Sequence, residues 1–305
     1  MNSMRTDLAM ESLGGASSFP GVEVRQWETC GVELTEVIVQ SEDAAEKLGK
    51  PCGNYLTLEC RLLAEQDPDA RIAVANLLGE ELARLISYTD DAPVLVVGLG
   101  NRGVTPDALG PETVDKILVT RHMLQSEYAG SGMKSVCAIA PGVLGVTGIE
   151  TMEMVESLAR KLQPRAIVCI DSLAARDSGR IGCAVQITNT GIQPGSGVGN
   201  HRRPLTRETV GAEVIAIGVP TVIYAATLSR DAFSLLARQS GGEPVSEEGL
   251  AQMERELLGT ELGNLIVTPR DIDAIVHNCA AMIAGGVNRA LQPKLSAQEI
   301  AEMTD

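Results

Sequence analysis

The chain has 305 residues and a formal net charge of −15, and only 2% of its residues are aromatic. This acidity excludes nucleic acids and anionic membranes as expected partners, because binding phosphates requires clustered lysine and arginine. No run approaches the roughly 18 to 20 apolar residues that span a bilayer, and the N-terminus lacks a signal pattern, so we expect a cytoplasmic protein. The seven cysteines are scattered and form no C-x-x-C pair, which predicts reduced and mostly buried thiols.

Helical and strand-like segments alternate from about residue 67 onward. This order predicts an α/β fold with a mostly parallel sheet flanked by helices. Continuous apolar runs predict strands that are buried on both faces, at 94–97, 135–140, 165–171, 183–188 and 213–219. The expected helices begin after Asp67, near Pro111 (extending to about 124), at 151–162, and after 265–269, where Thr268 is the expected cap.

The regular pattern is confined to the middle and the end of the chain. We expect residues 8–66 to form an irregular N-terminal layer, 67–225 the core, and 226–305 a helical C-terminal region, all within one α/β domain. No internal repeat or low-complexity linker interrupts this order.

The apolar run that begins at Val94 opens into a glycine loop similar to a dinucleotide-binding loop, with Gly98, Gly100 and Gly103. Pro106 and Pro111 place the start of the next helix well past these glycines, so its N-terminus does not meet a phosphate there. The strand at 135–140 also ends without the acidic residue that binds a ribose. We therefore interpret the loop as a tight turn that delivers Asp107. A nucleotide- or metabolite-binding module that uses the three glycines is the alternative.

Two carboxylates follow predicted strands: Asp107 after the first and Asp171 at the end of the strand at 165–171. Open α/β sheets place their sites at the carboxyl ends of strands, although each residue also fits a local role as a turn residue or cap. Two carboxylates about 4 Å apart repel by roughly 4 kcal/mol, so one is held protonated as an acid while the other serves as a base toward water. A bridging metal is the other way to tolerate the repulsion, but the chain has only three histidines and no H-E-x-x-H motif.

A third candidate region is the loop at 189–203, where four glycines fall within nine residues. Such backbone either turns tightly or lets another chain approach closely. Ser196, assisted by His201, fits a nucleophile, but Gly195-Ser196-Gly197 is more typical of an ordinary loop. Arg202 and Arg203 fit either an acidic side chain of a substrate or solvated surface positions.

Several separate blocks stand in order from the N-terminus to about residue 225: Arg5-Thr6-Asp7-Leu8-Ala9, Val97 to Asn101, Thr105 to Pro111, Thr120-Arg121-His122, Gly142 to Thr151, Ile170 to Ala174, Thr190 to Asn200, and Ile215 to Thr221. Together these blocks resemble the germination proteases of spore-forming bacteria, which degrade small acid-soluble spore proteins.

This resemblance implies a core similar to that of hydrogenase-maturation endopeptidases, a homotetramer in the forespore or spore core, and synthesis as a zymogen. It also implies an aspartate-dependent mechanism, which we assign to Asp107 and Asp171. From the loop residues themselves we expect Gly195, Ser196, Gly197, Arg202 and Arg203 to help hold the substrate. Metal dependence stays open, because the family has also been classed among metallopeptidases. Family substrates are cut after the acidic residue of motifs similar to Thr-Glu-Phe-Ala or Thr-Glu-Ile-Ala. Thr6-Asp7-Leu8-Ala9 looks like such a motif, so we predict self-cleavage between Asp7 and Leu8, which releases a pro-segment at 1–7.

Overall fold

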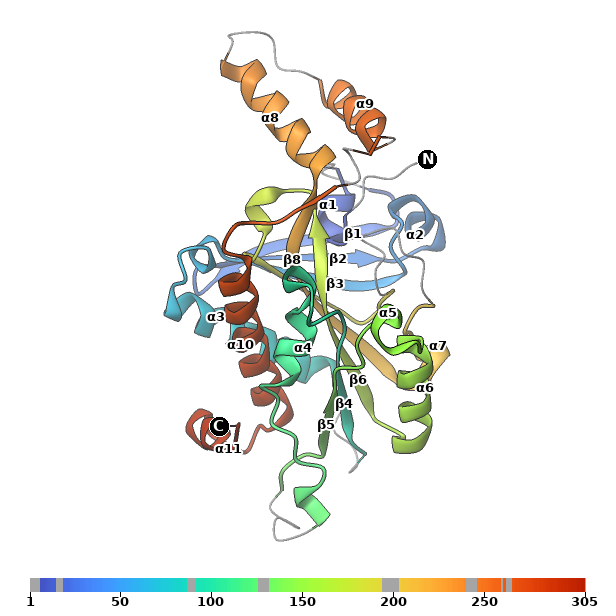
Figure 1. Ribbon diagram of the computed structural model, residues 1–305, viewed down its shortest axis with the longest axis vertical. Helices are drawn as coiled ribbons and strands as arrows, with labels where there is room; N and C mark the ends of the chain where they lie inside the picture. The colour runs from blue at the N-terminus through green and yellow to red at the C-terminus, as the bar shows by residue number, and fades with distance from the viewer. Residues whose placement is uncertain are drawn as a thin grey trace.

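The computed structural model describes residues 6–14, 19–86, 92–125, 132–193, 203–239, 246–258, 260–261 and 265–304. These residues fold around one mixed sheet with helices on both of its faces (Figure 1), which confirms the predicted α/β fold class. Within the described ranges the nine strands have the order β1-β2-β3-β7-β8-β6-β4-β5, and β9 pairs with β8. The strands are β1 (Val22–Thr29), β2 (Val32–Val39), β3 (Gly53–Glu59), β4 (Val94–Gly98), β5 (Val136–Ile139), β6 (Ala166–Ala175), β7 (Ala184–Thr188), β8 (Glu213–Tyr224) and β9 (Ile266–Val267).

Four strands, β5, β4, β6 and β8, form the parallel half of the sheet. Every residue of β4 is buried, and β6 is buried at all but one position, as expected for apolar strands that are covered on both faces. β6 and β8 continue past their predicted ends at 171 and 219, because the two strands stay paired through a register shift at Leu173/Ala174. Asp171 therefore lies within β6 and not at its end.

The antiparallel half contains β1, β2, β3 and β7, and β7 joins it to β8. Cys30 and Gly31 both have positive φ in the turn between β1 and β2, which is the conformation of a tight hairpin. The sequence predicted an irregular layer at 8–66, but residues 22–59 form three strands and a helix instead. β1 is a largely exposed edge strand, so the apolar alternation by which a strand is recognised is limited to Val22 and Val24.

Helices cover both faces of the sheet. α3, α4 and α10 share the larger apolar core with one face, and α6 and α7 pack on the opposite face. Residues of α1 lie on that second face as well, against β2 and β3. The helices are α1 (Ala9–Ser12), α2 (Glu42–Leu48), α3 (Pro68–Leu85), α4 (Leu109–Val114), α5 (Leu144–Thr147), α6 (Thr151–Leu162), α7 (Arg207–Val210), α8 (Ala225–Gln239), α9 (Glu247–Leu258), α10 (Ile272–Leu291) and α11 (Ala297–Thr304).

Two helix boundaries differ from the sequence prediction. The helix expected from Pro111 to about 124 is the short α4, because Asn288 of α10 binds the next backbone groups: it donates to the carbonyl oxygen of Lys116 and accepts from the N–H of Leu118, both at 2.9 Å. Thr268 does not cap α10, because its hydroxyl donates to the carbonyl oxygen of Thr221 at 2.8 Å and the helix begins only at Ile272.

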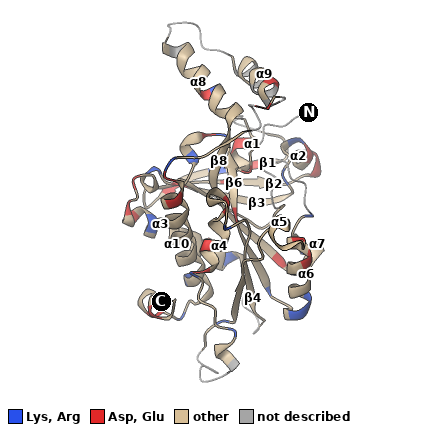
Figure 2. Ribbon diagram, in the orientation of Figure 1, with Lys and Arg blue, Asp and Glu red and all other residues tan. Residues whose placement is uncertain are grey.

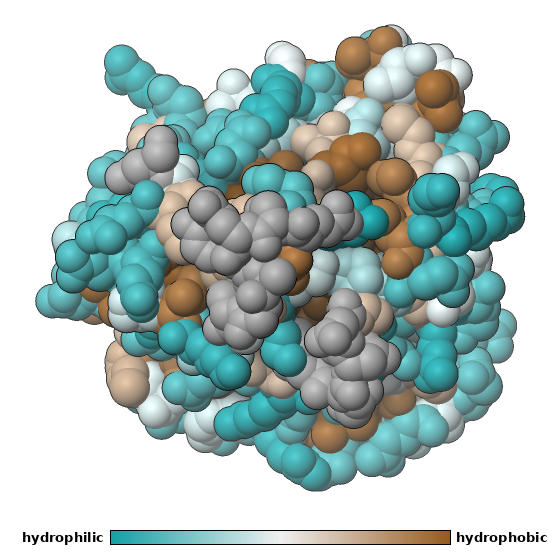
Figure 3. Space-filling model, turned by 90° about the horizontal axis from the view of Figure 1, so that it is seen from below, coloured by the Kyte–Doolittle hydropathy of each residue, from teal (hydrophilic) through white to brown (hydrophobic). Residues whose placement is uncertain are grey.

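The surface carries charges of both signs. Basic residues are scattered among acidic ones over the helices and loops of Figure 2, and the face in Figure 3 shows apolar patches between polar residues. No helix of the described residues is both long and apolar enough to cross a membrane. The seven cysteines are unpaired and four of them are buried, as predicted: Cys60, Cys169, Cys183 and Cys279.

Candidate active site

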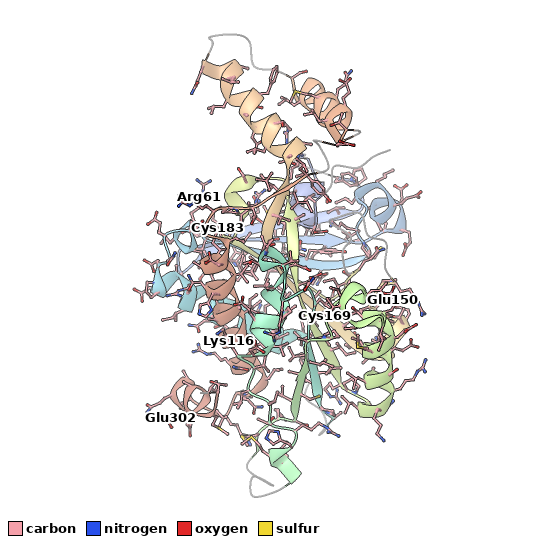
Figure 4. All side chains as sticks on the ribbon, viewed as in Figure 1. Arg61, Lys116, Glu150, Cys169, Cys183 and Glu302 are labelled. Carbon is pink, nitrogen blue, oxygen red and sulfur yellow. The ribbon has the colours of Figure 1, made fainter. Side chains whose placement is uncertain are left out.

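Asp171 lies in β6 just past the end of β4, whose last residue, Gly98, pairs with Ile170. Asp171 is only 7% exposed, and its Oδ1 accepts a hydrogen bond of 2.9 Å from the N–H of Ser172. Cys169, two residues earlier, lies in the apolar core beneath α6 (Figure 4). The pKa of its thiol is raised, mainly by burial and further by the charge of Asp171.

Asp107 ends the 3-10 turn η2 (Thr105–Asp107), which several backbone contacts hold in place. The carbonyl oxygen of Asp107 accepts from the N–H of Asn101 at 2.9 Å, and the carbonyl oxygen of Pro106 accepts from the hydroxyl of Thr221 at 2.7 Å. Gly100 has a φ of +116°, and a Cβ at this position would lie 2.0 Å from the carbonyl oxygen of Asp107. Glycine is therefore required there so that the turn can approach its own loop.

The glycine loop has a structural role. A Cβ at Gly98 would lie 2.2 Å from the carbonyl oxygen of Gly110 in α4. Gly98 and Gly100 thus allow close backbone packing between β4, η2 and α4. This packing fills the space next to the two glycines where a phosphate-binding loop would hold its ligand.

The structure places both Asp171 and the turn that carries Asp107 close to the C-terminal end of β4. The N–H of Leu99 donates to the carbonyl oxygen of Ile170 at 2.8 Å. A Cβ at Gly110 would lie 2.3 Å from the oxygen of Leu99 and 2.5 Å from that of Ile170, so α4 begins directly over this junction. η2 also contacts both β6 and β8. Asp107 and Asp171 consequently lie on neighbouring parts of the fold beyond the end of β4, and their catalytic role stays a prediction.

A row of residues across the sheet connects Asp171 to the antiparallel half. Asp171 pairs with Gly218 of β8, and Gly218 pairs with Gln186 of β7. Residues in register point to the same face, and neighbouring strands are about 4.8 Å apart, so the Cα atoms of Asp171 and Gln186 are separated by roughly 10 Å. A Cβ at Gly218 would lie 2.5 Å from the side chain of Leu173. Because Gly218 has no side chain, the side chain of Leu173 can pack against it.

The predicted processing segment lies against this row. The N–H of Asp7 donates to the carbonyl oxygen of Ala174 at 2.9 Å, and Oδ2 of Asp7 accepts from the N–H of Ala174 at 2.8 Å. Leu8 is fully buried in an apolar cluster with Leu173, Ala175 and Ile223. Ala9 is also fully buried, in the cluster with Val37, Val39, Ala44 and Tyr55.

Two side chains that the sequence analysis missed hold the backbone of this segment. The carbonyl oxygen of Asp7 accepts from Nζ of Lys50 at 2.9 Å and from Nε2 of Gln186 at 3.2 Å. Oε1 of Gln186 accepts from the N–H of Ala9 at 2.8 Å, and Lys50 also donates to the carbonyl oxygen of Thr6 at 3.1 Å. Burial lowers the pKa of Lys50, against the opposing effect of the Asp7 and Glu11 charges.

Glu11 anchors the same segment from its other end. Its carboxylate accepts from the N–H groups of Arg176 and Asp177 at 2.7 and 3.0 Å, and it pairs with Arg180 at 2.8 Å. Arg180 also pairs with Glu59 of β3 at 2.6 Å. Burial acts to lower the pKa of Arg180, but the bonds to the two glutamates outweigh it and raise the pKa. The segment after Leu8 is thereby tied to both β3 and the chain after β6.

Of the remaining predicted substrate-binding residues, the structure describes one. Arg203 is exposed. Gly195, Ser196, Gly197 and Arg202 lie outside the described residues. The base of their loop is closed by backbone hydrogen bonds of 2.9 and 2.8 Å between Ile192 and Leu205. In the part of the chain that the structure describes, no group of three or more His, Cys, Asp or Glu residues is arranged to hold a metal ion.

Comparison with known proteins gives consistent matches over most of the chain. The family model described as germination protease matches residues 3–256. Proteins named germination protease from Caldanaerobacter subterraneus subsp. tengcongensis and Clostridium tetani are 42% and 39% identical, each match covering 98% of both chains. One from Priestia megaterium is 36% identical over 99% of this chain and 97% of its own. A hydrogenase maturation protease, HycI from Thermococcus kodakarensis, matches 68% of this chain and 98% of its own at 15% identity and a TM-score of 0.32.

These sequence matches define the class of the protein as a peptidase. The chain belongs to the germination protease family, as the sequence blocks suggested. Its function at this level is proteolysis during spore germination.

Proposed function

We propose that this chain is an aspartate-dependent endopeptidase that cuts after an acidic residue, with Asp107 and Asp171 as the catalytic pair. The observation that carries the proposal is the position of residues 6–9: an acidic motif is paired to β6 three residues beyond Asp171, and the turn η2, which carries Asp107, contacts the same strand. The proposed substrates are small acid-soluble spore proteins that contain Thr-Glu-(Phe/Ile)-Ala motifs.

The chemistry requires two different protonation states. One carboxylate takes a proton from water while the water oxygen forms a bond to the carbonyl carbon of the acidic residue. The other carboxyl gives its proton to the departing amide nitrogen as the carbon–nitrogen bond breaks. The products are an amine and a carboxylic acid, which then loses its proton to solvent, and the proton has moved from one aspartate of the pair to the other. Repulsion between two nearby carboxylates favours the singly protonated state that this cycle needs.

The contacts of residues 6–9 support the motif specificity. Ala174 donates its N–H to the carboxylate of Asp7, which favours an acidic residue before the cut. Leu8 fills an apolar cluster of a size that suits Leu, Ile or Phe, and the tight surroundings of Ala9 suit a small residue. We therefore propose that Thr6-Asp7-Leu8-Ala9 is a substrate sequence bound in its own site, that the zymogen cuts itself between Asp7 and Leu8, and that residues 1–7 are the pro-segment.

Replacement of either aspartate tests the assignment. Asp107→Asn and Asp171→Asn should each lower the rate of cutting a peptide that contains Thr-Glu-Ile-Ala by at least a thousandfold, since amide side chains neither accept nor supply the required proton. The matched control is Asp43→Asn, which changes an exposed aspartate in an ion pair with Lys47 and should leave the rate unchanged. Full activity in both active-site variants would overturn the proposal.

The same peptide-cleavage assay tests whether the activity depends on a metal ion. In this account the two carboxylates act on water directly, so activity should survive dialysis against a chelator. Loss of activity that one added divalent metal restores would make Asp107 and Asp171 metal ligands instead.

We also propose that the chain works as a homotetramer in the forespore or spore core. Large apolar side chains on α8 support self-association, since Leu228, Phe233, Leu235 and Leu236 are all at least 44% exposed. α8 and α9 project together from one end of the molecule (Figure 1). A monomer mass by light scattering at micromolar concentration would contradict the tetramer.

A further inference from the structure

Two hydrogen-bond donors converge on a single carbonyl oxygen, that of Asp7. Nζ of Lys50 lies 2.9 Å from it and Nε2 of Gln186 lies 3.2 Å from it. In the proposed function this oxygen belongs to the peptide bond that is cut. An amide oxygen gains negative charge when water adds to its carbon, and donors aimed at that oxygen stabilise the charge.

Gln186 spans the bond between Asp7 and Leu8. Its amide nitrogen binds the oxygen before the bond, and its amide oxygen accepts the N–H of Ala9 two residues later. The side chain is held in a buried position, since Gln186 is 6% exposed in a strand whose other residues are also buried. One amide group therefore fixes both the carbonyl and the register of the bound chain.

Lys50 approaches the same oxygen from a different element. It follows Gly49, which ends α2 with a φ of 69°, and its own N–H donates to the carbonyl oxygen of Ala45 at 3.2 Å. This turn directs the lysine back over the processing segment, where its ammonium binds the oxygens of both Thr6 and Asp7. A positive charge placed there strengthens the electrostatic effect of the neutral amide.

We infer that Lys50 and Gln186 are the oxyanion-binding pair of this peptidase. The inference rests on the proposed function and adds two catalytic residues to it. As the water oxygen bonds to the carbonyl carbon, the π electron pair of the carbonyl moves to oxygen, where both donors hold it. The electron pair returns to the carbonyl bond when the carbon–nitrogen bond breaks and the nitrogen takes its proton. After residues 1–7 leave and Leu8 and Ala9 withdraw from their pockets, the acidic residue of a protein substrate takes the place of Asp7 against the same two donors.

The pair is tested in trans with a Thr-Glu-Ile-Ala peptide and mature enzyme that begins at Leu8. Lys50→Met and Gln186→Glu should each lower kcat by about a hundredfold to a thousandfold, as the loss of one oxyanion donor does, with KM changed less than about tenfold. Lys50→Arg keeps the charge and the donor, so it should recover part of the loss. Lys47→Met, on the exposed face of α2, is the matched control and should behave as the wild type.

Chemical rescue separates a catalytic loss from a folding defect. In Lys50→Ala, added propylammonium should restore part of kcat, whereas a neutral propyl alcohol should not. If Lys50→Met and Gln186→Glu both keep the wild-type kcat while Asp171→Asn is inactive, this inference is wrong, but the proposed catalytic role of the two aspartates is unaffected. A change in KM alone, or the absence of any ammonium rescue, would also overturn it. No cleavage by the wild type would remove the proposed function and this inference together.

Discussion

The two halves of the sheet contribute different parts of the proposed site. The parallel half contributes the two aspartates: Asp171 lies within β6 just past the end of β4, and the turn η2, which carries Asp107, contacts β6 and β8. The antiparallel half and the segment laid over it supply Gln186, Lys50 and the residues that hold Thr6 to Ala9. In this account, the parallel half performs proton transfer and also pairs with Asp7 through Ala174, while Gln186 of the antiparallel half binds the carbonyl oxygen of the bond that is cut. Gly218, between Asp171 and Gln186, is where the halves meet.

The halves also differ in how they are held together. The parallel half depends on close backbone contacts at glycine, at Gly98 and Gly100 above all. The antiparallel half depends on a partly buried ionic cluster in which Arg180 bridges Glu11 and Glu59. Substitutions in the two halves should therefore destabilise the protein for different physical reasons.

The largest expected effect on stability is in the ionic cluster. The side chain of Glu11 is only 2% exposed, and removing one partner of a buried pair costs about 3–5 kcal/mol. Glu11→Ala should lower the free energy of unfolding by about 3 kcal/mol or more in urea titrations, because the N–H groups of Arg176 and Asp177 lose their acceptor. The same variant should slow self-cleavage, because Glu11 holds the processing segment in place.

An exposed ion pair serves as the control for the buried cluster. Lys47 and Asp43 are 60% and 70% exposed, so Asp43→Ala should change the free energy of unfolding by no more than about 0.5 kcal/mol. If Glu11→Ala and Asp43→Ala lower the free energy of unfolding equally, the buried cluster contributes no more stability than an exposed ion pair.

A smaller effect is expected from an added methyl group in the parallel half. A Cβ at Gly98 would lie 2.2 Å from a backbone oxygen of α4, and overpacking of this kind costs about 1–3 kcal/mol. Gly98→Ala should thus retain its fold at 25 °C but lose most of its activity, since relief of the clash moves η2 and Asp107. Gly145→Ala is the matched control, because no atom lies within 4 Å of its Cβ position. Wild-type activity in Gly98→Ala would break the link between the glycines and Asp107.

The sequence predicted the parallel half better than the antiparallel half. β4 and α6 were found because apolar runs and helical periodicity are local signals. Asp171 stood out because it ends an apolar run, where the sequence predicted the end of the strand. β1 gave no signal, because an exposed edge strand has little apolar character, and α4 ended early because Asn288, distant in sequence, binds the next backbone groups.

The peptide-binding side chains could not be predicted in the same way. Lys50 and Gln186 are 43 and 179 residues from Asp7 in the sequence, so only the fold brings them to its carbonyl oxygen. A signal was present for Gln186, which is polar in the otherwise apolar run Ala184-Val185-Gln186-Ile187. A buried amide must find hydrogen-bond partners, and the backbone of residues 7–9 provides them. Lys50 has no comparable signal.

The central claim is that residues 6–9 occupy the active site as a substrate. The most direct measurement is the intact mass of the purified full chain over time at mildly acidic pH, for the wild type and for Asp171→Asn. We expect the wild type to lose residues 1–7 and acquire an N-terminus at Leu8, while Asp171→Asn keeps its full mass. A wild-type chain that cuts the Thr-Glu-Ile-Ala peptide but keeps residues 1–7 under every activating condition would contradict the claim.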